Sequence, residues 1–398
     1  MKPTIIPFKG TYYNSDLIKD FSKVVCPPYD IINKRDFYDF LKKSEYNFCN
    51  ILLNFDGDYK KIGIKFREWL DKKILIDDDK ESIYLYEQKF NFNSKKFVRF
   101  GIISLLWMKR KDLIIPHEFT LKSPKEDRRK IIREVNANLS PIFIVSFKKL
   151  QSLRKIYRKY FRKEPLFSLT DYEGNLNRVW KISDKKDIDS VLADFNNQKF
   201  LIADGHHRFE VAYEFYKENK NKFKDLDYVL SYITDPQKGL LVLPIHRIVH
   251  FDSQEQFFKE LEKYFYVQRV LRKDLFLKFK ESKTFCCGLY KSFNFYFLRL
   301  KENIKLDKRL KGLDSYELEE VLKKFFKDKD KVIYSHNLEE AIKLTSDNKA
   351  LFILREPKLS LIFKIVEKRV KLPQKSTFFY PKILSGLILR RFKKNEDI

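Results

Sequence analysis

Glycine and proline are scarce in this sequence, and it has no long apolar run. Its 398 residues include 10 Gly and 13 Pro, against about 7% Gly and about 5% Pro in an average protein. The longest uncharged apolar stretch lies near residues 101–108, well short of the roughly 18 residues that cross a bilayer. The N-terminus also lacks the apolar segment of a signal peptide. Neither a membrane protein nor a secreted protein is predicted.

The four cysteines have no spacing that suggests a cross-link or a metal site. Cys26 and Cys49 stand alone and Cys286 and Cys287 are adjacent, so there is no Cys-x-x-Cys pair. Adjacent cysteines have poor geometry for bonding to each other. This usage is typical of a reducing compartment. We therefore expect a soluble, cytoplasmic protein without a structural zinc ion.

The familiar nucleotide-binding sequences are missing as well. No G-x-x-x-x-G-K-[S/T] loop and no G-x-G-x-x-G turn occurs, which excludes the common P-loop and dinucleotide-binding patterns. There is no G-x-S-x-G elbow either, so acyl hydrolysis has no support. Any phosphate-binding site must therefore be built in another way.

The chain carries a large positive charge, because Lys plus Arg is 82 and Asp plus Glu is 55, which gives +27. Such a charge is typical of proteins that bind nucleic acids or membrane surfaces. The basic residues are nevertheless scattered and rarely form a run longer than three, whereas a nucleic-acid footprint is clustered. The chain is also rich in Lys, Asn, Ile, Phe and Tyr, the composition that an A/T-rich genome produces. We interpret most of the charge as compositional and predict no nucleic-acid partner.

Helical and strand-like patterns alternate throughout, which predicts an α+β fold of mixed sheets with peripheral helices. A helix is expected to end near residues 66–70. Strand-like runs occupy residues 83–90, 97–107, 200–203 and 240–245.

Three parts are expected along the chain: an N-terminal α+β part over residues 1–150, a central part over 151–250, and a C-terminal α+β part over 251–398 that closes on the site. The charged, helix-capable stretch 148–163 is the best candidate for a connection between the first two.

The strongest local motif is Asp204-Gly205-His206-His207-Arg208. An apolar, strand-like run precedes it and apolar residues at helical spacing follow it, so the motif is expected to form the turn between a strand and a helix. A helix N-terminus attracts anions, Gly205 lets a phosphate approach the backbone, and Arg208 offers two donors. Asp204 would then be free to hold Mg²⁺ or to accept a proton. In the alternative interpretation Asp204 caps the helix and both histidines are solvated.

A second motif begins at His117-Glu118 and continues through residues 123–129. Ser123, followed by Pro and then by Glu three residues on, predicts a capping box at a helix start. Lys125 and Arg128 crowd the first turns of that helix, where cations are unfavourable, so a bound polyanion is expected there. The alternative is a solvated basic face that Glu and Asp at 126 and 127 partly neutralise. His117 and Glu118 would supply an acid or a base.

With these motifs the chain resembles the bacterial and archaeal family known as "domain of unknown function 1015". The matching stretches follow family order over nearly the whole chain: 26–30 (C-P-P-Y-D), 85–90 (L-Y-E-Q-K-F), 116–118 (P-H-E), 123–128 (S-P-K-E-D-R), 136–143 (N-A-N-L-S-P-I-F), 203–210 (A-D-G-H-H-R-F-E), 243–247 (L-P-I-H-R), 375–382 (K-S-T-F-F-Y-P-K) and 385–387 (S-G-L). Residues 313–318 depart from the family pattern, since an expected His is missing there.

The resemblance implies a ParB/sulfiredoxin-like nucleotide-binding core. The turn at residues 204–208 is similar to the phosphate-binding turn of that superfamily, to which free-serine kinases belong. Sulfiredoxin-like members have a Cys where His206 stands. Because that thiol is missing, reduction of a sulfinic acid is not expected.

The sequence therefore predicts a kinase that transfers the γ-phosphoryl group of ATP to a small-molecule hydroxyl, with free L-serine as the expected acceptor and O-phosphoserine as the product. Phosphoryl transfer needs charge neutralisation and alignment more than covalent chemistry. Glu118 is the expected base, with His117 beside it, and Asp204 is the alternative base or the Mg²⁺ ligand. The residues expected to bind the phosphates are Gly205, His206, His207, Arg208, Lys125 and Arg128. Asp30 and Lys382 are expected to bind the ammonium and carboxylate groups of the substrate.

Two other functions stay open at this point. A ParB-like, nucleotide-dependent DNA-binding regulator would account for the charge, although no helix-turn-helix candidate is visible. A nucleotide hydrolase or phosphatase could use the same turn with water as acceptor. The identity of the donor nucleotide and the oligomeric state are likewise not fixed by the sequence.

Overall fold

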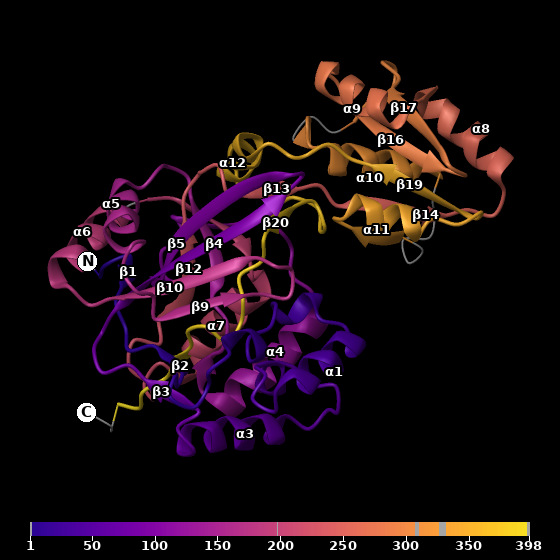
Figure 1. Cartoon of the computed structure of the whole chain (residues 1–398). Helices are drawn as coiled ribbons and strands as arrows, with labels where there is room; N and C mark the ends of the chain where they lie inside the picture. Colours follow the sequence, from indigo (N-terminus) through magenta and orange to yellow (C-terminus); the bar gives the residue numbers. More distant parts are fainter. Residues whose placement is uncertain (1, 197, 307–309, 326–331, 396–398) are drawn as a thin grey trace. The chain divides into compact units, whose positions relative to one another are not determined.

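The computed structural model describes residues 2–196, 198–306, 310–325 and 332–395. The chain forms two compact units (Figure 1). The first comprises Met1–Pro116, Thr120–Leu240 and Pro381–Ile398, and the second comprises His117–Phe119 and Leu241–Tyr380. Both units combine sheets with helices, so the predicted α+β class is confirmed.

The first unit is built on a nine-stranded sheet with the order β6-β11-β8-β12-β5-β4-β10-β9, and β1 also pairs with β5. Neighbouring strands are antiparallel except for the pairs β6–β11 and β8–β12, which are parallel. The strands are β1 (Ile5–Ile6), β4 (Ile83–Phe92), β5 (Lys95–Trp107), β6 (Ile114–Pro116), β8 (Ile142–Ser146), β9 (Phe167–Thr170), β10 (Leu176–Ile182), β11 (Phe200–Asp204) and β12 (Tyr228–Thr234).

Local sequence explains the long β4–β5 hairpin. Asn93 and Ser94 form its two-residue turn, and both have positive φ, 48° and 61°, as type I′ hairpin turns require. The strand-like runs predicted at 83–90, 97–107 and 200–203 are confirmed by β4, β5 and β11.

Strands from the first two predicted parts of the chain interleave in this sheet. β10 pairs with β4 and β12 pairs with β5, so residues 1–150 and 151–250 share one hydrophobic core. The last residues, Pro381–Ile398, also belong to this unit. The structure therefore groups the chain differently from the three parts expected. Strand pairing between distant residues cannot be predicted from the local sequence pattern.

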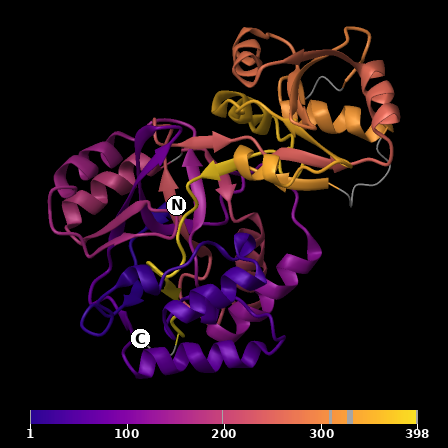
Figure 2. The same ribbon diagram turned by 45° about the vertical axis from the view of Figure 1, so that its right-hand side comes forward.

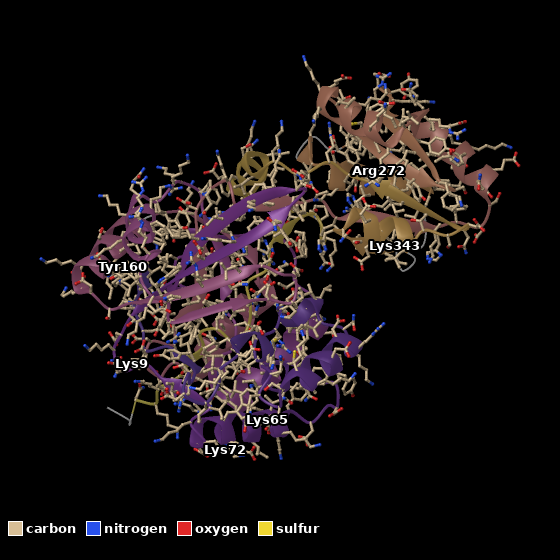
Figure 3. All side chains as sticks on the ribbon, viewed as in Figure 1. Lys9, Lys65, Lys72, Tyr160, Arg272 and Lys343 are labelled. Carbon is tan, nitrogen blue, oxygen red and sulfur yellow. The ribbon has the colours of Figure 1, made fainter. Side chains whose placement is uncertain are left out.

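Helices α5 (Gln151–Tyr160) and α6 (Lys185–Phe195) pack on the sheet of the first unit. Leu153, Ile156 and Tyr160 of α5 are buried in its core, and Figure 3 labels Tyr160. The prediction that residues 148–163 form a connection is therefore wrong. The many Lys and Arg residues of α5 obscured an apolar stripe at helical spacing.

A second core in the same unit involves α1 (Lys34–Lys43), α2 (Cys49–Leu52), α3 (Tyr59–Asp71), α4 (Lys122–Val135) and the small sheet of β2 (Thr11–Tyr13) and β3 (Leu75–Asp77). The helix predicted to end near residues 66–70 is α3. The basic side chains of this unit are dispersed: Lys9 precedes β2, whereas Lys65 lies on α3 and Lys72 follows it (Figure 3).

The second unit is built on an antiparallel six-stranded sheet with the order β15-β17-β16-β19-β14-β18, shown in orange to yellow in Figure 2. The strands are β14 (His246–His250), β15 (Phe265–Val270), β16 (Cys286–Lys291), β17 (Asn294–Leu300), β18 (Val332–Ser335) and β19 (Lys349–Ile353). A separate pair joins β13 (Leu241–Leu243) to β20 (Phe378–Tyr380). The run predicted at 240–245 is thus a shorter strand.

Helices cover both faces of the six-stranded sheet. One core contains side chains of α8 (Gln254–Tyr264) and α10 (Asp314–Phe325). The other contains side chains of α9 (Arg272–Glu281) and α11 (Leu338–Lys343). Helix α12 (Leu359–Glu367) completes the unit. Successive residues of a strand point to opposite faces, so Cys286 and Cys287 lie in different cores.

All four cysteines are free and buried. Among the residues that the structure describes, no helix has both the length and the apolar character that a membrane crossing requires.

Candidate functional site

The predicted turn between a strand and a helix is confirmed at residues 204–208. Strand β11 ends at Asp204, Gly205 has φ of +90°, and α7 (His206–Asn219) begins at the next residue. A Cβ atom on Gly205 would lie 2.9 Å from Nη2 of Arg208. Glycine is therefore required here for two reasons. The backbone is left-handed, and the Arg208 guanidinium lies where a side chain would start.

Asp204 forms two ion pairs in this turn. Its Oδ2 accepts from Nη2 of Arg208 at 2.7 Å, and its Oδ1 accepts from Nζ of Lys382. Burial by itself would raise the pKa of Asp204, but the positive charges of Lys382 and Arg208 outweigh it and lower this pKa to about 2. Asp204 is therefore a carboxylate at neutral pH, held between two cations.

The three side chains are largely buried, with 13% of Asp204, 13% of Arg208 and 9% of Lys382 exposed. One carboxylate and two cations give this cluster a net charge of 2 − 1 = +1. The sequence predicts Lys382 at a separate contact with the substrate carboxylate. The structure places it on Asp204, 178 residues away in the chain.

The N-terminus of α7 has no side-chain cap, and its first turn contains no acidic residue. The alternative in which Asp204 caps this helix is therefore not what the structure shows. His206 is buried at this helix start. An uncapped helix start with the positive end of its dipole beside a cluster of net charge +1 favours an anion.

Helix α4 begins differently from the capping box expected at Ser123. The helix starts at Lys122, its N-cap is Leu121, and no side-chain cap is made, so Ser123 lies inside the first turn. The Leu121 N–H instead donates to Nε2 of His207 at 2.9 Å. No serine cap forms, and the N–H of the N-cap residue is bonded to the imidazole of a neighbouring helix. Because Nε2 of His207 accepts this hydrogen bond, it carries no proton that it could donate to a phosphate.

Replacing His207 by Leu is expected to lower the free energy of unfolding by about 1 kcal/mol, the usual net value of one hydrogen bond. Urea unfolding measures this change. His207→Gln, which keeps an acceptor, serves as the control and is expected to recover part of the loss. Equal stability of the Leu variant and the parent would show that the Leu121–His207 bond contributes nothing.

Three basic residues of α4 are paired with acidic residues of α7. Three ion pairs join the helices: Lys125–Glu210, Arg129–Glu214 and Arg133–Glu218. Both partners advance by four residues from one pair to the next, so the two helices run parallel. Thr120 adds a hydrogen bond to Glu210 at 2.7 Å.

This pairing corrects the expectation that the first turns of α4 need a bound polyanion. The positive charge of Lys125 is matched by Glu210 at 3.0 Å. Arg128 donates Nε to Asp127 at 2.8 Å and Nη1 to the Leu52 carbonyl at 2.8 Å. The compensating charges therefore come from α7 and from α4 itself.

Arg128 and Arg208, both expected at the phosphates, line one cavity of about 50 Å³. Apolar side chains, with Asn138 and Ser140, form most of its wall. It has room for a few water molecules. The Arg128 guanidinium also lies 4.0 Å from the ring centre of Tyr29, while the neighbouring Asp30 is exposed.

His117 and Glu118 belong to the second unit. His117 is buried, and its Nε2 lies 3.0 Å from Oγ1 of Thr377 and 3.6 Å from Oε1 of Glu118. Thr377 lies in the matching stretch 375–382 and is not among the site residues predicted from the sequence. The structure thus brings His117 and Glu118 to that stretch, and their roles as acid or base stay predictions.

Comparison with known proteins gives one family. The family model described as "Protein of unknown function (DUF1015)" matches residues 5–316. The chain belongs to this family. The family resemblance seen in the sequence motifs is therefore confirmed. No curated protein matches the chain.

Several solved structures are similar over 72% of this chain. A free serine kinase variant in complex with ADP has 14% identity and a TM-score of 0.40, with 90% of that chain covered. A conserved hypothetical protein from Pyrococcus furiosus has 15% identity, a TM-score of 0.36 and 94% of its chain covered. C-terminally truncated SbnI from Staphylococcus aureus has 10% identity, a TM-score of 0.39 and 86% covered.

Proposed function

We propose that the protein is a phosphotransferase that moves the γ-phosphoryl group of ATP to the hydroxyl of a small metabolite, with free L-serine as acceptor. The observation that carries the proposal is the turn at Asp204–Arg208: a largely buried cluster of net charge +1 lies at the uncapped start of α7. Such a site favours phosphate oxygens. The similarity of this turn to that of free-serine kinases supports the choice of reaction.

The residues of the turn supply the charge neutralisation that phosphoryl transfer needs. The first N–H groups of α7 and the Arg208 guanidinium are proposed to bind the phosphates, with His206 beside them. Gly205 keeps the backbone accessible. Lys382 and Arg208 hold Asp204, and an arriving phosphate would share these two cations with it.

Mg²⁺ does not fit Asp204 as the structure arranges it. Both carboxylate oxygens already accept from cations, and Mg²⁺ in nucleotide sites is usually bound by one or two carboxylates together with the phosphates. The described ranges contain no group of three or more His, Cys, Asp or Glu residues that could hold a metal ion. We therefore assign no step of the reaction to a metal on Asp204.

Glu118 is the proposed base. In the reaction it would accept the proton of the serine hydroxyl, and the serine oxygen would form a bond to the γ-phosphorus of ATP. The bond from that phosphorus to the β–γ bridging oxygen would break, which releases ADP. Asp204 suits this role poorly, because a base is most effective when its pKa lies near the working pH and the pKa of Asp204 is about 2.

The substrate contacts change with the structure. Lys382 is occupied by Asp204, so we propose it as a phosphate-side residue. Asp30 is exposed and stays the proposed partner of the substrate ammonium group.

Incubation with ATP, Mg²⁺ and a panel of amino acids, followed by mass spectrometry, tests the proposal. O-Phosphoserine and ADP in equal amounts, formed only when serine is present, is the expected result. ADP and inorganic phosphate formed at the same rate without any acceptor would point to a hydrolase. Absence of a phosphorylated product, together with duplex DNA binding that persists at about 0.2 M salt, would favour the ParB-like regulator.

A further inference from the structure

We propose that Gln88 and Arg99 are positioning residues that hold the backbone at Pro381 and Lys382, so that the Lys382 ammonium group meets Asp204. The purpose of the ion pair between Lys382 and Asp204 rests on the proposed function. The positioning of this ion pair by Gln88 and Arg99 does not depend on that function.

Gln88 and Arg99 lie directly opposite each other on β4 and β5 and are both fully buried. Nη2 of Arg99 donates to Oε1 of Gln88 and to the carbonyl of Pro381. Nε2 of Gln88 donates to the carbonyl of Lys382 at 3.1 Å. Two successive backbone carbonyls are thus fixed by one cross-strand pair.

Aromatic rings enclose the Arg99 guanidinium, whose centre lies 4.7 Å from the ring centre of Phe143 and 5.8 Å from that of Tyr232. Gly101 makes room for this packing, because a Cβ there would lie 2.6 Å from the Tyr232 ring. Burying an arginine is costly, and apolar residues at such positions are often as stable or more so. A charged group kept in this core is consistent with a positional role.

The direction of the Lys382 side chain follows from this anchoring. Its carbonyl and the preceding one are fixed, the φ of Pro381 is restricted by its ring, and Nζ of Lys382 is bound to Asp204. Gln88 and Arg99 are themselves inaccessible, so any effect on a ligand is indirect, and we expect it to pass through Lys382. This gives a role to the matching stretch 85–90, which the proposed function leaves unused.

A double-mutant cycle tests the proposal without any ligand. Urea unfolding is measured for the variants Asp204→Asn and Lys382→Met and for their combination. The same set is then measured in a Gln88→Met background, in which the side chain keeps its length but loses its hydrogen bonds. The coupling free energy between Asp204 and Lys382 is expected to fall to less than half when Gln88 is replaced. An unchanged coupling overturns the proposal.

Gln237→Met is the matched control. The amide of Gln237 also donates to a backbone carbonyl of the first unit, that of Phe100 at 2.9 Å. Within the part of the chain that the structure describes, the hydrogen bonds of Gln237 go to other residues than 381 and 382. Its replacement is expected to lower stability and leave the coupling intact. If Gln88→Met does not fold, Gln88→Asn, with a shorter amide, takes its place.

ADP affinity gives a second readout. Gln88→Met is expected to weaken ADP binding severalfold in the parent and to have no further effect in the Lys382→Met background. Equal effects in both backgrounds would contradict action through Lys382. If the parent binds no ADP, the proposed function fails while the result of the stability cycle stands.

Discussion

Glu118→Gln is expected to lower turnover by about 10² to 10⁴ while leaving nucleotide affinity nearly unchanged. The amide keeps the size and hydrogen bonding of the carboxyl group but cannot accept the proton of the serine hydroxyl, and general-base catalysis contributes about this factor. Steady-state formation of O-phosphoserine gives the turnover, and calorimetric titration with ADP gives the affinity.

Glu126→Gln is the control for this variant. Glu126 lies on α4, is about half exposed and pairs with Arg129, so its replacement is expected to leave turnover as it is. Near-normal turnover of Glu118→Gln would show that another group is the base, and Asp204→Asn would be measured next. Because the pKa of Asp204 is about 2, that variant is expected to change nucleotide affinity more than turnover.

Arg208→Ala is expected to weaken ADP binding by about tenfold to a hundredfold. Hydrogen bonds to charged groups contribute roughly 1.5 to 3 kcal/mol, which corresponds to that range. Arg208 also bridges Asp204 and the Pro141 carbonyl, so some stability is lost with it. ADP titration of a variant shown by circular dichroism to be folded separates the two effects.

Arg133→Ala is the matched control, because it removes an arginine from an exposed ion pair of the same helix pair. It is expected to bind ADP like the parent. If Arg208→Ala also binds ADP like the parent, the turn at Asp204–Arg208 is a structural element of the fold and no phosphate site.

The turn itself was predictable from the sequence because its determinants are local. A buried apolar run, a glycine and a helical repeat of apolar residues follow one another within about 15 residues, and Gly205 has the positive φ that such a turn needs. The partner of Asp204 was not predictable in this way. Lys382 reaches it across 178 residues, through strand pairing and buried hydrogen bonds that leave no local pattern.

The start of α4 shows how tertiary contacts override local chemistry. Ser123 and Glu126 have capping-box spacing, yet the helix starts one residue earlier without a side-chain cap, and the N–H of its N-cap residue donates to the imidazole of His207 on another helix. The cations in the first turns of α4 predict a bound anion, yet three cations of this helix face Glu210, Glu214 and Glu218 at matching intervals of four residues on α7. A sequence read one segment at a time does not reveal such a pairing of two helices.

If the turn at Asp204–Arg208 binds nucleotide phosphates, replacing Gly205 by Ala must weaken that binding, and ADP titration of Gly205→Ala measures the loss. A Cβ at this position would press on the Arg208 guanidinium and strain a backbone with φ of +90°. Gly174→Ala is the matched control, since Gly174 has φ of +81° and no atom within 4 Å of the added carbon. Gly205→Ala is expected to lose at least tenfold in ADP affinity, and Gly174→Ala is expected to lose only stability. A parent that binds no ADP, or a Gly205→Ala variant that binds it as tightly as the parent, would show that this turn is not a phosphate site.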